Sequence, residues 1–140
     1  MRKLLQRLAV VGATTATLGA VAASPAMAAT GGGCNQRTDT TPCISWSNNF
    51  VYGDFYQYAA PDSSRVKYRI EIWTGRPNKP WVRKNTRTGA IDHTGHYAAL
   101  SQGVASLPAA DEHAMTRVII FSSSGATALQ VDSPVVYYLT

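Results

Sequence analysis

The sequence predicts a small all-β protein: an immunoglobulin-like antiparallel β-sandwich of about seven or eight strands, with a small β-barrel as the alternative. Short runs of β-branched and aromatic residues alternate with turn sequences about every 8–12 residues. No helical periodicity is sustained over more than about two turns after the first 28 residues. The length suits a single folded domain with one core.

Residues 1–28 have the pattern of a secretory signal peptide. Basic residues open the segment, an apolar run spans Leu8–Ala23, and Ala26-Met27-Ala28 places small residues at the −3 and −1 positions of a cleavage site. The apolar run is too short and too polar to remain as a membrane span. We therefore expect a secreted, extracellular chain that begins at Ala29. Its formal charge falls from +5 to +2, because the removed segment holds three bases and no acid.

Residues 29–43 are expected to form a flexible N-terminal arm and a disulfide-closed loop. Ala29–Gly33 is too rich in glycine to form a stable element alone, so it is either a frayed terminus that adds little stability or an arm that orders by strand addition on a partner. The two cysteines, Cys34 and Cys43, predict one disulfide in an oxidising exterior, contributing about 2–3 kcal/mol. The polar segment Asn35–Pro42 is then a surface hairpin or Ω-like loop.

Strand sequence dominates the remainder, so the β-sandwich domain is assigned to residues 44–140. Ile44–Tyr58 is rich in aromatic and β-branched residues, with turn candidates at Asn48-Asn49 and Gly53-Asp54. Ala60–Ser64 has the composition of a further turn.

Val66–Trp73 shows the clearest alternation of the chain and predicts a half-buried antiparallel strand. Its inward face holds Val66, Tyr68, Ile70 and Ile72, and its outward face holds Lys67, Arg69, Glu71 and Trp73. The predicted core combines the inward face with residues from later strands: Val66, Tyr68, Ile70, Ile72, Val118, Ile120 and Tyr137.

Turn and strand signals continue to the end of the chain. Gly75–Pro80 is expected as a loop because its two prolines cannot donate to a ladder. Arg117–Ser122 is expected as a central strand buried on both faces because it is almost continuously apolar. Ala109–Met115 is assigned one helical turn or a short helix, and Ile91–Leu100 is ambiguous. The other assignments are Trp81–Thr86 as extended, Thr88-Gly89 as a turn, Ser123-Ser124-Gly125 as a hairpin turn, Ala126–Val131 and Val135–Leu139 as strands, and Asp132-Ser133-Pro134 as the bend between them.

Three clusters of chemically capable residues each have a structural explanation. Asp92-His93-Thr94-Gly95-His96 contains a His-x-x-His pair, but its sequence surroundings offer no third metal ligand at a defined spacing. Asp111-Glu112-His113 carries its carboxylates on adjacent residues, which do not converge on a substrate and suit a helix start. Ser122-Ser123-Ser124-Gly125 has turn composition and no nucleophile elbow. We therefore expect no catalytic residue, no metal and no cofactor.

A basic cluster is the main functional signal. Residues 65–87 hold eight bases against one acid, Glu71, which gives a local charge of +7. Trp73 and Trp81 lie within it, and arginine with tryptophan is the composition of interface hot spots, although a merely solvated face explains the charge equally well. The candidate interface joins the arm to this cluster: Ala29, Thr30, Gly31, Gly32, Gly33, Lys67, Arg69, Trp73, Arg76, Lys79, Trp81 and Arg83.

These features favour a secreted, non-enzymatic protein-interaction module, an adaptor that docks on other secreted proteins. The first alternative is an inhibitor of a secreted protease or other hydrolase, which would present Gly75–Trp81 to an active site. The second is a carbohydrate-binding module that uses Trp46, Trp73, Trp81 and the tyrosines; a small hydrolase is least favoured. Nucleic acid is not an expected partner, because much of the chain's basicity lies in the signal segment.

In its Ala/Thr-rich signal ending at Ala26-Met27-Ala28, its size and its compact β body, the chain resembles the small adaptor subunit of umbrella toxin particles from high-GC Gram-positive bacteria. That family implies a β-sandwich whose N-terminal extension links a large ring-forming repeat toxin to a trypsin-like lectin subunit. The resemblance covers the mature chain at the level of architecture and transfers no functional residue. Ala29–Arg37 is the segment where it coincides with the interpretation from the residues.

The exported protein is expected to begin at Ala29 and to contain the Cys34–Cys43 disulfide. Intact-mass spectrometry of secreted material should give the mass of residues 29–140 less two hydrogens. Two free thiols would contradict the disulfide, and retention of residues 1–28 would contradict the secretory assignment.

Overall fold

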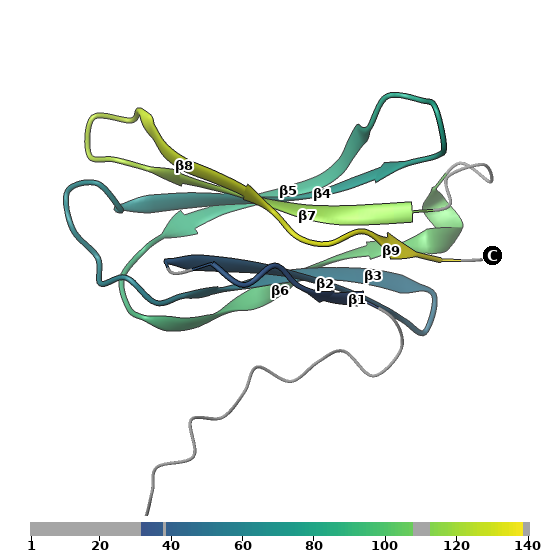
Figure 1. The fold of residues 1–140 in the computed structure, drawn as a ribbon, viewed down its shortest axis with the longest axis horizontal. Coiled ribbons are helices and arrows are strands. Elements are labelled where there is room, and N and C mark those ends of the chain that lie inside the picture. Colours follow the sequence, from purple (N-terminus) through teal and green to yellow (C-terminus); the bar gives the residue numbers. More distant parts are fainter. Residues whose placement is uncertain (1–31, 38, 108–112, 139–140) are drawn as a thin grey trace, which may run out of the picture.

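The computed structural model describes residues 32–37, 39–107 and 113–138. These residues form nine β-strands and one short 3₁₀ helix, and the strands make two antiparallel sheets packed face to face (Figure 1). The predicted β-sandwich is therefore confirmed. No helix among the described residues is long and apolar enough to cross a membrane.

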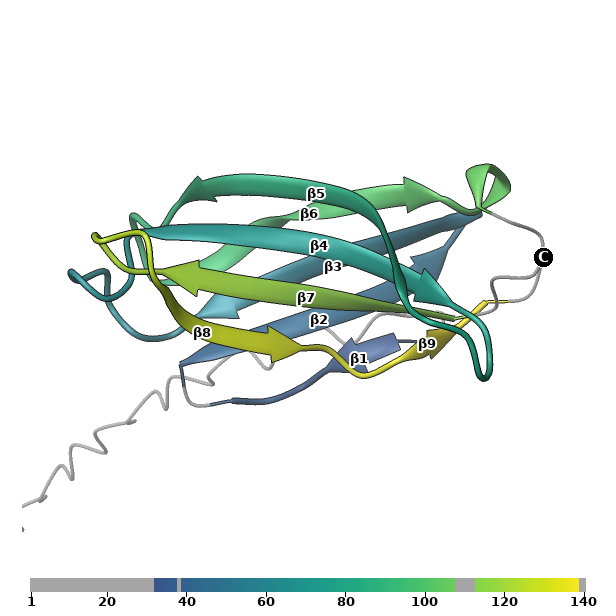
Figure 2. The same cartoon turned by 90° about the horizontal axis from the view of Figure 1, so that it is seen from above.

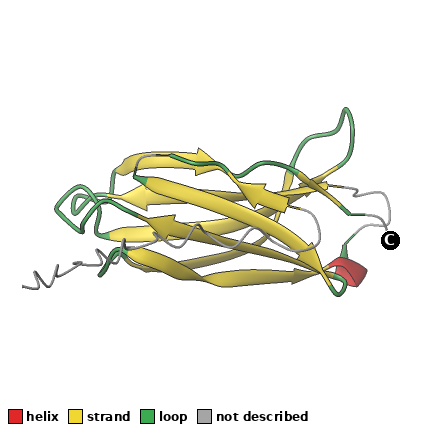
Figure 3. Cartoon of the chain, turned by 60° about the horizontal axis from the view of Figure 1, so that its bottom comes forward, coloured by secondary structure: helices red, strands yellow, loops and turns green. Residues whose placement is uncertain are grey.

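The sheets have four and five strands. The four-stranded sheet has the order β1-β2-β3-β6, with β1 at Gly32–Cys34, β2 at Thr40–Ser47, β3 at Phe50–Gln57 and β6 at Gly95–Gly103. The five-stranded sheet has the order β5-β4-β7-β8, and β9 pairs with β7 as well. Its strands are β4 at Lys67–Gly75, β5 at Val82–Ala90, β7 at His113–Phe121, β8 at Thr127–Asp132 and β9 at Val136–Tyr137. The 3₁₀ helix, Val104–Ser106, follows β6 at one end of the sandwich (Figure 3).

The core lies between the two sheets. Its buried residues confirm five of the predicted ones: Tyr68, Ile70, Ile72, Val118 and Ile120. The ring of Tyr68 packs against those of Phe55 and Tyr97, at centroid distances of 5.0 and 5.3 Å. The inward face assigned to β4 is thus correct, because hydrophobic burial selects one side of an alternating strand.

Two predicted core residues are exposed. Val66 precedes β4 and its exposed fraction is 37%, while Tyr137 in β9 is 70% exposed. In β9 the partner of Val136 is the buried Ala114, so Val136 faces inward and Tyr137 faces outward. Tyr138 is buried in place of Tyr137, since side chains alternate along an extended chain.

Part of the supposed flexible arm belongs to the four-stranded sheet. Gly32 pairs with Ser45 in β2, and Gly33 pairs with Ile44. Gly32 has φ of +120°, and a Cβ there would lie 2.1 Å from the Ile44 carbonyl oxygen, so the position requires glycine. Deletion of the two glycines would remove ladder pairs, contrary to the small effect expected of a free arm. Residues 29–31 lie outside the described residues.

The disulfide Cys34–Cys43 is confirmed and joins directly opposite residues of β1 and β2. The amide of Asn35 donates to the Pro42 carbonyl at 3.0 Å, so the segment between the cysteines is a hairpin. Its second half, Thr40–Pro42, is buried in β2 rather than exposed in a loop. The side chain of Asn35 also donates to the Asp132 carbonyl at 2.9 Å, which ties this hairpin to the other sheet.

Two predicted turns are wrong because a strand continues through them, and one predicted helix is wrong where it can be compared. Gly53-Asp54 lies inside β3 at a bulge, and Thr88-Gly89 lies inside β5. Both glycines allow close packing: a Cβ would lie 2.4 Å from Thr116 at Gly53 and 2.5 Å from the Tyr68 ring at Gly89. In Ala109–Met115, residues 113–115 begin β7 rather than a helix, and the rest lies outside the described residues.

The turn at Asn48-Asn49 is confirmed as a two-residue hairpin connection. Both residues have positive φ, 50° and 63°, which asparagine tolerates well. The hairpin turn at Ser123-Ser124-Gly125 is also present, with Gly125 at φ 83°.

β5 and β6 lie side by side as outer strands of different sheets (Figure 2). The guanidinium of Arg87 in β5 donates to the carbonyls of Ala98 and Ala99 in β6. The side-chain amide of Asn85 donates to the Ser101 carbonyl at 2.8 Å. Side chains therefore join the two sheets along this edge.

Replacement of Ile70 by alanine is expected to lower the free energy of unfolding by about 2–4 kcal/mol, because the side chain is fully buried between the sheets. Chemical denaturation of the mature protein measures the change. Val82→Ala is the control, since Val82 is an exposed aliphatic residue and should cost less than about 0.5 kcal/mol. Equal effects of the two substitutions would contradict the core assignment.

Candidate interaction surface

Seven of the predicted interface residues lie on or beside the outer face of the five-stranded sheet. They are Lys67, Arg69 and Trp73 in β4, Arg83 in β5, Arg76 and Lys79 in the β4–β5 loop, and Trp81 just before β5. Antiparallel pairing of β4 with β5 brings these segments together. Other strands of the sheet add Arg117, Asp132, His113 and Tyr137. We call this set of residues, together with Glu71, the basic face.

A buried carboxylate lies at the centre of the basic face. Glu71 occupies an outward position of β4, yet only 1% of the residue is exposed. Its Oε1 lies 2.8 Å from Nε of Arg69 and accepts a hydrogen bond of 3.0 Å from Arg83, and its Oε2 accepts one of 2.7 Å from the Trp73 indole. Three long side chains therefore cover the carboxylate of Glu71, and both arginines form ion pairs with it.

A second ion pair fixes the neighbouring strands. Arg117 of β7 donates to both carboxylate oxygens of Asp132 in β8, at 2.7 and 2.8 Å. These hydrogen bonds raise the pKa of Arg117. The guanidinium also lies over the Trp73 ring, 5.0 Å from its centroid, in a cation–π contact. Trp73 is thus held between Glu71 and Arg117.

An aromatic row crosses one end of the basic face. The ring of His113 contacts Trp81 at a centroid distance of 4.7 Å and Tyr137 at 5.6 Å. Gly75 lies opposite His113 in the ladder and has no side chain, which leaves room for the Trp81 ring beside it. Because Tyr137 is 70% exposed, the row offers an aromatic surface to a partner.

The β4–β5 loop carries two exposed cations of the basic face, Arg76 and Lys79. The loop extends beyond the ends of the neighbouring strands (Figure 1), and the amide of Lys79 donates to the Arg76 carbonyl at 3.2 Å to close a turn. Arg76 and Lys79 are exposed, as is Lys67 on β4. Within the described part of the chain, these three side chains form no ion pair.

Gly32 and Gly33, the described part of the predicted arm, do not join the basic face. Gly32 and Gly33 lie in β1, at the edge of the other sheet, and Ala29, Thr30 and Gly31 lie outside the described residues. The candidate interface is therefore two separate places rather than one surface.

The two histidines of the candidate metal pair each contact a different carboxylate. Nδ1 of His93 lies 2.6 Å from Asp92, and Nε2 of His96 lies 2.6 Å from Asp54. The hydrogen bond from His93 lowers the pKa of Asp92. Among the described residues no three potential ligands gather around one point. Asp111 and Glu112 of the third cluster lie outside the described residues, and His113 belongs to the aromatic row.

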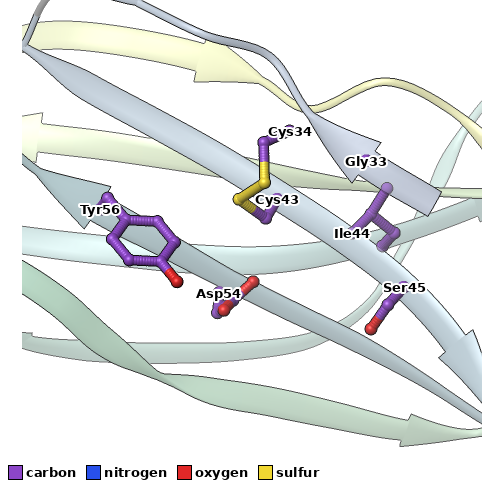
Figure 4. Close-up of a pocket in the computed structure, with 7 residues that line it drawn as sticks. All are labelled: Gly33, Cys34, Cys43, Ile44, Ser45, Asp54 and Tyr56. Carbon is purple, nitrogen blue, oxygen red and sulfur yellow. A yellow bond between two sulfur atoms is a disulfide. The ribbon is translucent and has the colours of Figure 1, made fainter. Parts of the chain in front are cut away.

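A small depression on the four-stranded sheet was not expected from the sequence. It has a volume of about 170 Å³ and lies between the disulfide, Ser45, Asp54 and the Tyr56 ring (Figure 4). Burial and the Asp54 carboxylate raise the pKa of Tyr56. The volume is below the roughly 300 Å³ at which small-molecule sites usually begin, so the depression is small for a ligand site.

Sequence reasoning missed four members of the basic face: Arg117, Asp132, His113 and Tyr137. They come from strands far along the chain, and their proximity depends on which strands pair. Two signals were visible: Arg117 precedes an apolar run and Asp132 follows one. Asp132 ends β8, as expected for a charged residue after an apolar run, whereas Arg117 lies in the middle of β7.

No known protein family matches this chain, and neither a curated protein nor a solved structure matches it. The resemblance to umbrella toxin adaptors therefore stays a prediction. The function must be inferred from the geometry of the basic face.

Arg69→Glu is expected to lower the free energy of unfolding by roughly 2–3 kcal/mol, because it sets a second carboxylate beside the buried Glu71. Lys67→Glu makes the same charge change two residues earlier on the same face, and should cost less than about 0.5 kcal/mol. Thermal and chemical denaturation would compare the two. Equal stabilities would contradict the central place of Glu71.

Proposed function

We propose that this chain is a secreted, non-enzymatic protein-interaction module, an adaptor subunit of an extracellular complex, whose basic face docks on an acidic surface of a partner protein. The observation that carries the proposal is the basic face itself. Ion pairs to Glu71 and Asp132 hold its arginines in place, beside exposed unpaired cations and an aromatic row.

The charge arrangement favours a partner of opposite sign. Three exposed cations have no ion pair within the described residues: Lys67, Arg76 and Lys79. Carboxylates on an acidic partner surface would pair with them. The arginines that contact Glu71 lose little side-chain freedom on binding, because their positions are already restricted. The aromatic row adds the apolar contact area typical of interface hot spots.

An extracellular site of action is supported by two features. Residues 1–28 have the pattern of an export signal, and the disulfide between β1 and β2 is of the kind that persists in oxidising surroundings. The resemblance to umbrella toxin adaptors would make the partners a large repeat toxin and a lectin-bearing subunit. Identification of co-purified proteins tests that proposal directly.

Inhibition of a secreted hydrolase is the second candidate, and the shape of the β4–β5 loop favours it. The loop projects from the sandwich, and its two prolines and the turn at Asn78 restrict its backbone. In contrast, a sugar-binding role through the tryptophans is less favoured. Arg117 covers Trp73, and Trp81 packs its ring against His113, so neither offers a free flat ring to a sugar.

The adaptor proposal predicts that Arg76→Glu reduces co-purification with the natural partner by at least about tenfold, because it reverses an exposed charge on the basic face. The mature protein, tagged at its C-terminus, would be recovered from the native secretome and its partners quantified by mass spectrometry. Arg37→Glu is the matched control, since Arg37 is exposed in the hairpin of the other sheet.

Deletion of residues 29–31 tests whether the partner binds the arm rather than the basic face. Loss of the partner on this deletion, with full retention by Arg76→Glu, would reject the basic face and favour the arm. A single hydrolase as the only partner, whose activity the protein blocks, would instead establish the inhibitor.

A further inference from the structure

A pocket opens at the end of the basic face opposite the aromatic row. It has a volume of about 360 Å³ and lies between the start of β4, the end of β5 and the β7–β8 turn. Its lining residues are Val66, Lys67, Arg69, Thr88, Phe121, Ser122, Ser123 and Gly125. A volume of this order lies within the roughly 300–1,000 Å³ usual for binding sites of small ligands.

The residues that line the pocket are partly apolar and partly polar. Val66 and Phe121 supply the apolar part, and Val66 is the exposed valine that β4 leaves outside the core. Thr88 and Ser123 supply hydroxyl groups, whereas the Ser122 hydroxyl already contacts Ser124 and the Ala126 carbonyl. An apolar wall with a few convergent polar groups is the usual composition of a ligand site.

The charge of the pocket selects the ligand. Nε of Arg69 contacts Glu71, and the Arg69 guanidinium lies 5.5 Å from the centroid of the Phe121 ring, so its charge is already engaged. Lys67 is the lining cation that forms no ion pair within the described part of the chain. No carboxylate lines the pocket, so a cationic ligand would find no counter-charge. A lysine without an ion pair favours an anionic ligand, and a carboxylate can accept a charge-assisted hydrogen bond from its ammonium.

We propose that this pocket binds a carboxylate attached to an apolar group, with the carboxylate on Lys67 and the apolar group against Val66 and Phe121. Two sources share this chemistry: the C-terminal residue of a partner polypeptide and a free aliphatic acid. The polypeptide source rests on the proposed adaptor function, because it would anchor the partner's chain end at the basic face.

Three probes test the proposal with the mature protein alone. The first is the peptide acetyl-Gly-Gly-Leu with a free carboxylate, the second is the same peptide with a C-terminal amide, and the third is hexanoate. Nuclear magnetic resonance titration of the labelled protein should show shifts at Lys67, Phe121 and Ser123. We expect the amide to bind at least about tenfold more weakly than the acid, because it cannot pair with the lysine.

The two sources give different results. Saturable binding of the peptide acid and not of hexanoate identifies the polypeptide end, and binding of hexanoate at equal or greater strength identifies the free acid. Equal binding of peptide acid and amide, or binding of none of the probes, would overturn the proposal.

Lys67→Gln should weaken binding of the carboxylate probe by at least about tenfold. Arg37→Gln, which removes one exposed positive charge that does not line the pocket, should leave it unchanged. Melting temperatures of both variants confirm that the fold is intact, and equal effects of the two substitutions would overturn the role of Lys67. These titrations need no partner, so they test the pocket separately from the proposed function. If the pocket binds the probe and the Arg76→Glu variant still retains the partner, the docking of the basic face is rejected and the pocket stands.

Discussion

The antiparallel pairing of β4 with β7 is the constraint on which the rest of the structure depends. The ladder runs without interruption from Lys67 opposite Phe121 to Gly75 opposite His113. It sets Ile70 beside Val118 on the inward side and Glu71 beside Arg117 on the outward side. A slip of one residue would exchange the two faces of a strand, so one register determines both the core and the basic face.

The outward side of this ladder is itself a packed layer rather than a solvated surface. Met115 and Ile119 are buried there although they face away from the core between the sheets. Beside them, Glu71 is enclosed by arginine and indole groups that satisfy its oxygens. Long cationic side chains can cover apolar surface with their stems and keep their charges at the water interface. The basic face therefore contributes to stability as well as to any binding.

Local sequence patterns predicted the fold well where the apolar residues form a clear pattern. The alternation of Tyr68, Ile70 and Ile72 defined β4, and the continuous apolar run after Arg117 defined the second half of β7. Prediction failed where a glycine had a packing role that the sequence does not reveal. Gly53 and Gly89 lie inside strands because Thr116 and Tyr68 occupy the space of a side chain. Gly32 joins a ladder because its partner strand and the disulfide hold it there.

The candidate site was predictable only in part, for a related reason. The density of bases between residues 65 and 87 marked the strand pair β4–β5 correctly. The sequence did not show that Glu71 would be buried among them, because an acid at an outward position is usually solvated. Nor did it show the contribution of Arg117 and Asp132, since that depends on the pairing of β7 with β4 and β8.

The side-chain bonds between β5 and β6 have a consequence for behaviour at high concentration. Outer strands of a sheet expose main-chain groups that can recruit another copy and start aggregation. Arg87 and Asn85 occupy carbonyls of Ala98, Ala99 and Ser101, which are then unavailable to a foreign strand. This edge is therefore protected by the chain's own side chains. The hydrogen bonds from Arg87 and Asn85 to β6 thus reduce the tendency of this edge to pair with another copy of the chain.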